Sequence, residues 1–90
     1  MAVPIYDVEI TDWVNKKINA KKPGITADEV WDVCYEPRRH NARWHDHPVH
    51  GRRLIVRGRT PGGRSLRIIL HPVDVELGKW RLKTAIAENG

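Results

Sequence analysis

Residues 51–70 read GRRLIVRGRTPGGRSLRIIL, two alternating segments on either side of a TPGG turn, and six of these twenty residues are arginine. Apolar side chains recur at every second position, at Leu54 and Val56 and again at Leu66 and Ile68. Neighbouring side chains of a strand point to opposite faces, so this spacing predicts a β-hairpin with one apolar face. Proline and glycine at the junction are typical of a tight turn.

The chain after this hairpin continues the same pattern. We expect three strands, over 51–59, 64–71 and 79–86, with a bend at Leu77 and Gly78 before the last. Alternation in the last strand puts Trp80, Leu82 and Thr84 on the apolar face. The opposite face then carries the cationic side chains Arg53, Arg57, Arg59, Arg67, Arg81 and Lys83.

Like charges on neighbouring strands destabilise a sheet, so an anion is expected on this face. Three sources of this negative charge are possible. The first is the chain itself, because Asp7 and Glu9 lie on this face if their segment joins the sheet. The second is an acidic partner protein, and the third is a nucleic acid whose phosphates bind the guanidinium groups.

The first 36 residues predict one strand and two helices. YDVEIT (6–11) alternates as a half-buried strand, and Thr11 caps a helix over 12–22 that KPG ends. Thr26 and Glu29 have the spacing of a capping box, which starts a second helix that runs through Tyr35 and stops at Pro37.

Residues 36–50, EPRRHNARWHDHPVH, show no clear period and hold two prolines, which predicts a long surface loop. The segment contains four histidines, His40, His45, His47 and His50. Three interpretations of them are open: ordinary polar loop residues, catalytic groups or metal ligands. HDH lacks the paired spacing of a helical or finger zinc site, so neither a metal nor another cofactor is expected. Trp44 either packs on the core or stacks an unpaired base.

Length and composition indicate a single domain over residues 1–90 with one modest core. Trp13, Trp31 and Trp80 are the expected bulky core residues, and Cys34, the only cysteine, is expected to be buried in a helix. No apolar run is long enough to span a membrane and MAVPIYDVEI resembles no secretory leader, so a cytoplasmic location is expected.

The charge is uneven along the chain. Residues 1–36 carry four lysines and seven acidic residues, a net charge of −3, whereas residues 37–90 carry twelve basic and four acidic residues, a net charge of +8. A basic half is typical of a protein that binds a polyanion or an acidic partner, although ordinary solubilising charge gives the same composition. The expected fold is α+β: an antiparallel sheet of about four strands with two helices on one face.

The chain resembles the BrnT-type ribonuclease toxins of bacterial type II toxin-antitoxin pairs, which have a RelE-like fold. The resemblance runs from KPGITADEVWDV through RLIVRGRTPGGRSLRIIL to WRLKTA. It implies a cytoplasmic, metal-independent endoribonuclease with an acidic antitoxin as partner. The implied site residues are Arg53 and Arg64 of the hairpin and Arg81 of the last strand.

Three departures from the family pattern leave a second function open. Lys22, Pro23 and Gly24 stand where the family has lysine, histidine and glycine, Ile86 stands where an arginine is common, and only AENG follows the last strand in place of a charged helix. The alternative to a ribonuclease is therefore a non-catalytic nucleic-acid-binding or protein-interaction domain of the same fold.

Metal-free RNA cleavage needs a base, an acid and cations that stabilise charge on the phosphate. Arginine supplies fixed charge, and histidine titrates near neutral pH. His50 is the first candidate base because it is nearest to the basic strand in sequence, and Lys83 is the second because surrounding arginines disfavour its charged form. The predicted catalytic residues are thus His50, Arg53, Arg64, Arg81 and Lys83, with Arg57, Arg59, Arg67 and Trp44 binding RNA.

Overall fold

A computed structural model describes residues 3–21, 24–36, 38 and 40–88 of the chain. The elements follow one another as β1 (Asp7–Glu9), α1 (Asp12–Asn19), α2 (Ala27–Cys34), β2 (His40–His47), β3 (Gly51–Arg59), β4 (Ser65–Asp74) and β5 (Lys79–Glu88). The five strands form one sheet in the order β1-β5-β4-β3-β2, in which β1 runs parallel to β5 and the other neighbours are antiparallel.

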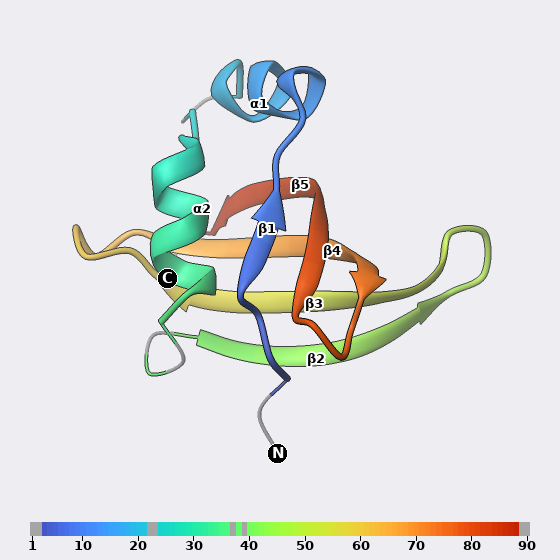
Figure 1. Cartoon of the computed structure of the whole chain (residues 1–90). Helices are drawn as coiled ribbons and strands as arrows, with labels where there is room; N and C mark the ends of the chain where they lie inside the picture. Colours follow the sequence, from blue (N-terminus) through green and yellow to red (C-terminus); the bar gives the residue numbers. More distant parts are fainter. Residues whose placement is uncertain (1–2, 22–23, 37, 39, 89–90) are drawn as a thin grey trace.

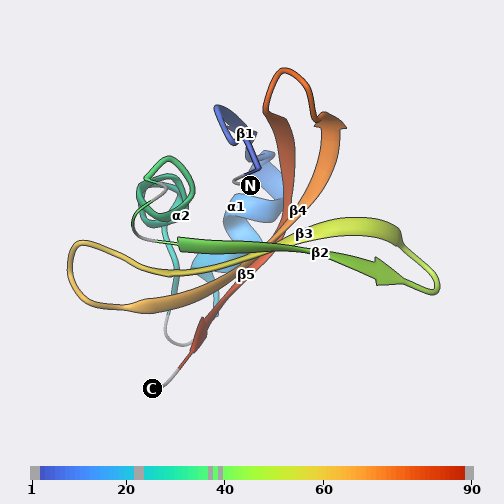
Figure 2. The ribbon, with the colours of Figure 1, turned by 90° about the horizontal axis from the view of Figure 1, so that it is seen from below.

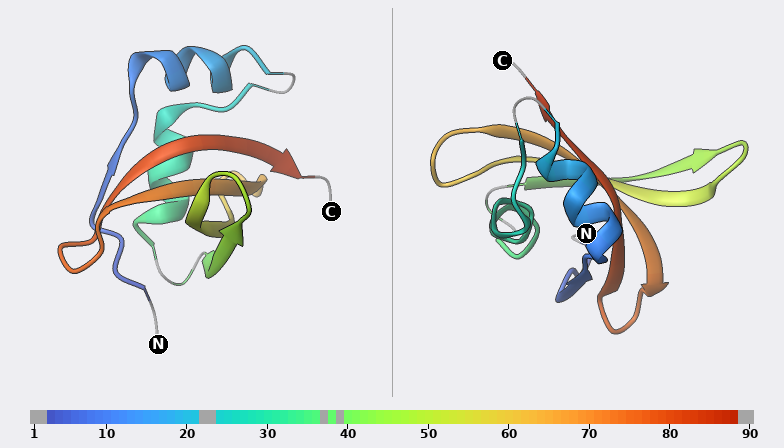
Figure 3. Two further views of the ribbon diagram at one scale, coloured as in Figure 1. Left: turned by 90° about the vertical axis from the view of Figure 1, so that its right-hand side faces the viewer. Right: turned by 90° about the horizontal axis from the view of Figure 1, so that it is seen from above.

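Both helices lie on the same side of the sheet, as seen in Figures 1 and 2. The β2–β3 hairpin reaches beyond them at one end, and the turn between β3 and β4 extends past α2 at the other (Figure 3). The fold is therefore α+β with a mostly antiparallel sheet, as expected, although the sheet has five strands where about four were predicted.

The predicted helix caps are present. The Thr11 hydroxyl accepts the Val14 amide proton at 3.3 Å, and Thr26 and Glu29 form the reciprocal capping box. Such caps satisfy amide groups that have no partner inside the helix. The first helix ends at Asn19 and not at 22, whereas Lys22, Pro23 and Pro37, the expected breakers, lie outside the described residues.

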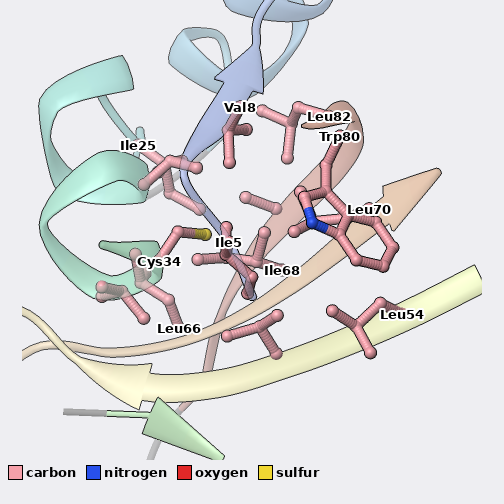
Figure 4. Close-up of a cluster of buried hydrophobic side chains, with 14 of the residues drawn as sticks. Ile5, Val8, Ile25, Cys34, Leu54, Leu66, Ile68, Leu70, Trp80 and Leu82 are labelled. Carbon is pink, nitrogen blue, oxygen red and sulfur yellow. The ribbon is translucent and has the colours of Figure 1, made fainter. Parts of the chain in front are cut away.

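The core lies between the helices and the sheet. Alternating side chains of β3, β4 and β5 meet the apolar faces of α1 and α2, and Figure 4 shows most of this cluster. Its fully buried members include Leu54, Val56, Leu66, Ile68, Leu70, Trp80 and Leu82 from the strands and Ile18, Val30, Val33 and Cys34 from the helices. Burial raises the pKa of the Cys34 thiol to about 12, which makes it a packing residue and a poor nucleophile.

The prediction of a loop over 36–50 is wrong for most of its length. Residues 40–47 form β2, which pairs with β3 from His40 opposite Gly58 to His47 opposite Gly51. Ala42 and Trp44 pack against the core while the side chains between them are exposed. A strand at the edge of a sheet contacts solvent along one edge and one face, so it tolerates this polar sequence.

The tryptophan predictions hold only in part. Trp80 is buried at 1% exposure and Trp31 is half-buried, its indole N–H donating to the Val8 carbonyl at 3.0 Å. The prediction for Trp13 is wrong, because its side chain is 76% exposed on the outer surface of α1. Val14 and Ile18 instead form the inner face of that helix.

The predicted alternation fails once, at a bulge in β5. Ile69 pairs with Thr84 but Leu70 pairs with Leu82, so Lys83 is the extra residue. A bulge of this kind reverses the alternation that follows it. Ala85 is consequently buried, and Thr84, predicted on the apolar face, lies half-buried opposite Ile69.

Candidate nucleic-acid interface

The side of the sheet that faces away from the helices is the candidate site, and we call it the open face. Strand register and alternation assign these residues to it: Asp7 and Glu9 of β1, Asn41, Arg43, His45 and His47 of β2, Arg53, Ile55, Arg57 and Arg59 of β3, Ser65, Arg67, Ile69 and His71 of β4, and Lys79, Arg81, Thr84, Ile86 and Glu88 of β5. Six of them are arginine, one is lysine and three are acidic. The sheet therefore gathers positive charge on its uncovered side.

The arginines stand close to one another. Arg57 and Arg67 are direct cross-strand partners, which places like charges side by side. Glu88 offsets them weakly, because its carboxylate lies 3.7 Å from Arg57 Nε and the arginine is largely solvent-exposed.

Two guanidinium groups on the open face have unsatisfied donors. The Nε atoms of Arg53 and Arg67 are buried, and within the described residues neither has a hydrogen-bond partner. Ile69, on the same face and outside the core cluster, is only 8% exposed. Leaving a buried donor unpaired costs free energy, so this arginine cluster has unsatisfied donors as well as like charges side by side.

Three histidines gather at the tip of the β2–β3 hairpin, next to these arginines. The ring centroids of His45 and His47 are 6.3 Å apart, and those of His47 and His50 are 4.7 Å apart. His45 is the cross-strand partner of Arg53. His50 and Arg53, both predicted as site residues, are thus in one region, and His45 and His47 join them.

His47 organises the turn. Its Nδ1 accepts the backbone N–H groups of Val49 and His50, each at 3.1 Å. Loss of hydration and the positive charge of Arg53, followed by His50 and His45, lower the pKa of His47 below its ordinary value. The neutral ring is therefore the form that fits the turn.

This arrangement predicts a pH-dependent turn. A lowered pKa in the folded chain means that the His47 contribution to stability is present above the ordinary histidine value of about 6.5 and is lost as the pH falls through the lowered value. In an NMR titration, the Val49 amide resonance is expected to shift with a midpoint below that of free histidine. His47→Gln should abolish this shift, and a midpoint above the free value would contradict the assignment.

Arg64 lies apart from the open face. One of its terminal nitrogens contacts both carboxylate oxygens of Glu29 at 3.0 Å, which ties the end of the hairpin to α2. Both side chains are partly buried in this contact. The structure therefore gives Arg64 a structural partner and does not bring it to Arg53.

Arg81 and Lys83 are both on β5, and Arg81 is the cross-strand partner of His71. Arg81 Nε is 3.3 Å from the Glu9 carboxylate, because β1 pairs in parallel with this part of β5. Of the three expected sources of negative charge, the chain's own carboxylates therefore account for Arg81. Lys83 is exposed at the bulge.

Trp44 points to the helix side of the sheet. Its ring centroid is 5.5 Å from that of Trp80, and the guanidinium carbon of Arg52 lies 4.1 Å from the Trp44 ring centroid. Trp44 was expected either to pack on the core or to stack an unpaired base, and its position in the structure is that of a core-packing residue.

A depression of about 430 Å³ lies over β2 and β3 on the open face, lined by Asn41, Arg43, Trp44, His45, Ile55 and Arg57. Sequence reasoning missed Asn41 and Arg43 as site residues because they fell in the predicted loop, and it named His45 only as one of four loop histidines. The alternation of Ala42 and Trp44 with these polar residues was the signal that identifies the strand.

Within residues 3–21, 24–36, 38 and 40–88, no three His, Cys, Asp or Glu side chains are arranged to hold a metal ion. No helix formed by these residues is long and apolar enough to cross a bilayer. Comparison of the chain with protein-family models, curated proteins and solved structures finds no match.

Proposed function

We propose that this protein binds single-stranded RNA on its open face and cleaves it without a metal ion, as a toxin-like endoribonuclease. The observation that carries the proposal is the cluster of Arg53, Arg57 and Arg67 on an uncovered sheet face, where Arg57 lies opposite Arg67 and the Nε donors of Arg53 and Arg67 have no partner within the described residues. A guanidinium fork matches the oxygens of a phosphate, and a row of such groups suits a polyanion.

The histidines at the hairpin tip supply the acid–base chemistry in this proposal. One imidazole, His50, takes the proton of a ribose 2′-hydroxyl, and the 2′-oxygen bonds to the adjacent phosphorus. The bond from phosphorus to the 5′-oxygen breaks, and a protonated neighbour, His45, gives that oxygen its proton. Arg53 stabilises the charge on the phosphate, and the products are a 2′,3′-cyclic phosphate and a 5′-hydroxyl.

The resemblance to the BrnT-type toxins supports the same function, and an α+β fold with helices on one face is compatible with their RelE-like class. The proposal therefore includes a bacterial cytoplasmic setting and an acidic antitoxin that covers the basic face. Arg81 and Lys83 serve in it as outlying phosphate contacts.

One observation favours the non-catalytic alternative. Arg64 and Arg81, two of the three arginines that the resemblance implies, are held by Glu29 and Glu9. A domain that binds RNA or an acidic protein without cutting needs only the remaining arginines of the open face.

A cleavage assay separates the two functions. The purified protein, incubated with an RNA oligonucleotide in chelator, is expected to cut it, and His50→Ala or Arg53→Ala to slow cutting by about 100-fold or more. The double variant Glu29→Gln/Arg64→Gln is the control, because it replaces the ion pair by neutral groups on the helix side and should cut at nearly the parent rate.

The other outcomes of this assay also discriminate between the proposals. Salt-sensitive binding without cleavage selects the non-catalytic alternative. Absence of both binding and cleavage rejects the RNA proposal, and equal cutting by His50→Ala and the parent rejects the histidine assignment. Circular dichroism of every variant confirms that the fold is intact.

A further inference from the structure

The depression over β2 and β3 combines three kinds of group. Ile55 is apolar, Arg43 and Arg57 carry fixed positive charge, and Asn41 offers a donor and an acceptor together. Among the six residues that line it, Asn41 is the only one with an uncharged, non-titrating side chain that offers both a donor and an acceptor. It therefore differs in function from the cationic groups around it.

Strand register fixes how these side chains sit. Asn41 is the cross-strand partner of Arg57, and Arg43 is the partner of Ile55, so the four form two adjacent rows on the open face. Side chains directly opposite in such a pair have Cβ atoms about 4.5–5.5 Å apart. The amide of Asn41 and the apolar surface of Ile55 thus lie between two guanidinium groups.

We infer that this depression holds one unpaired adenine, with Asn41 as the residue that selects the base. The inference rests on the proposed RNA binding and names a subsite within it. The base packs on Ile55, and the phosphates on either side of it bind Arg43 and Arg57. A base inside a duplex is stacked and paired, so it does not enter.

The choice of adenine over guanine follows from the amide group. Adenine presents a donor at N6 beside an acceptor at N7, which the oxygen and nitrogen of one asparagine amide satisfy together. Guanine presents two acceptors, O6 and N7, on the same edge, which suits a guanidinium group better than an amide. With both arginines bound to phosphates, the amide is the group left to read the base.

The test measures binding of fluorescein-labelled nine-residue oligouridines with a central uridine, adenosine, guanosine or cytidine. All carry 2′-fluoro groups, which remove the attacking hydroxyl and prevent cleavage. The parent protein is expected to bind the adenosine oligonucleotide about tenfold more tightly than the all-uridine one. Asn41→Ala should reduce that preference to less than twofold while changing affinity for the all-uridine oligonucleotide by less than twofold.

Asn19→Ala is the matched control, because Asn19 is an exposed amide on α1 and should keep the full preference. Equal affinity of the parent for all four oligonucleotides overturns the inference, and salt-sensitive binding in that case leaves the proposed function standing. A guanosine preference that Arg43→Gln abolishes overturns it in favour of guanidinium reading. Binding of none of the oligonucleotides rejects the proposed function together with the subsite.

Discussion

Trp80→Ala is expected to lower the free energy of unfolding by about 3–5 kcal/mol, the cost of removing a large buried aromatic side chain. Trp80 is 1% exposed, and its indole N–H donates to the Pro4 carbonyl at 2.9 Å. Its ring also lies 5.5 Å from Trp44, so it links the first residues of the chain to β2 and β5.

A domain of this length has a total free energy of unfolding of only about 5–13 kcal/mol, so the variant should have a much lower urea midpoint. If the parent protein lies at the low end of that range, a substantial fraction of the variant should be unfolded without urea. Trp13→Ala is the matched control, because the Trp13 side chain is 76% exposed, and a change within about 0.5 kcal/mol is expected. Equal losses for the two tryptophans would contradict the arrangement of the core.

The double variant Arg53→Gln/Arg67→Gln is expected to weaken RNA binding by more than about tenfold at low salt and to reduce the slope of log affinity against log salt by about 1.4, the value for two lost single-strand phosphate contacts. The same variant removes two unsatisfied buried donors and one of the like charges opposite Arg57. Its free energy of unfolding should therefore stay the same or rise.

Lys16→Gln/Lys17→Gln is the matched control for charge, since it also removes two cations, both exposed on α1 and away from the open face. Fluorescence anisotropy over a range of salt concentrations, with urea unfolding of each variant, checks both parts. If the two double variants lose the same affinity, binding follows net charge and the open face has no special part in it. A large loss of stability in the arginine variant would instead make those arginines structural.

The hairpin over 51–70 shows how far local pattern is sufficient. Leu54, Val56, Leu66 and Ile68 are buried as their alternation predicts, and the segments on either side of TPGG form β3 and β4. The capping box of Thr26 and Glu29 is also a local property, because it involves residues three apart. Such features depend on neighbours in sequence, and both were predicted correctly.

β2 shows where local pattern was insufficient. An edge strand needs only one buried row, here Ala42 and Trp44, and its polar residues and flanking proline favour a loop by propensity. Its pairing with β3 supplies the hydrogen bonds that decide the matter. Asn41, Arg43 and His45 reach the candidate site only through that pairing.

Local patterns in the chain specify the sheet hairpin, the helix starts, the buried aliphatic rows and a surplus of arginine on the opposite side of the strands, because alternation and capping act over a few residues. Which charges remain unpaired depends instead on contacts between distant segments. Glu29 reaches Arg64 across 35 positions of the chain and Glu9 reaches Arg81 across 72, and the bulge at Lys83 changes which β5 side chains face the core. Ion pairs and bulges depend on which strands become neighbours, and that is set by packing of the whole chain.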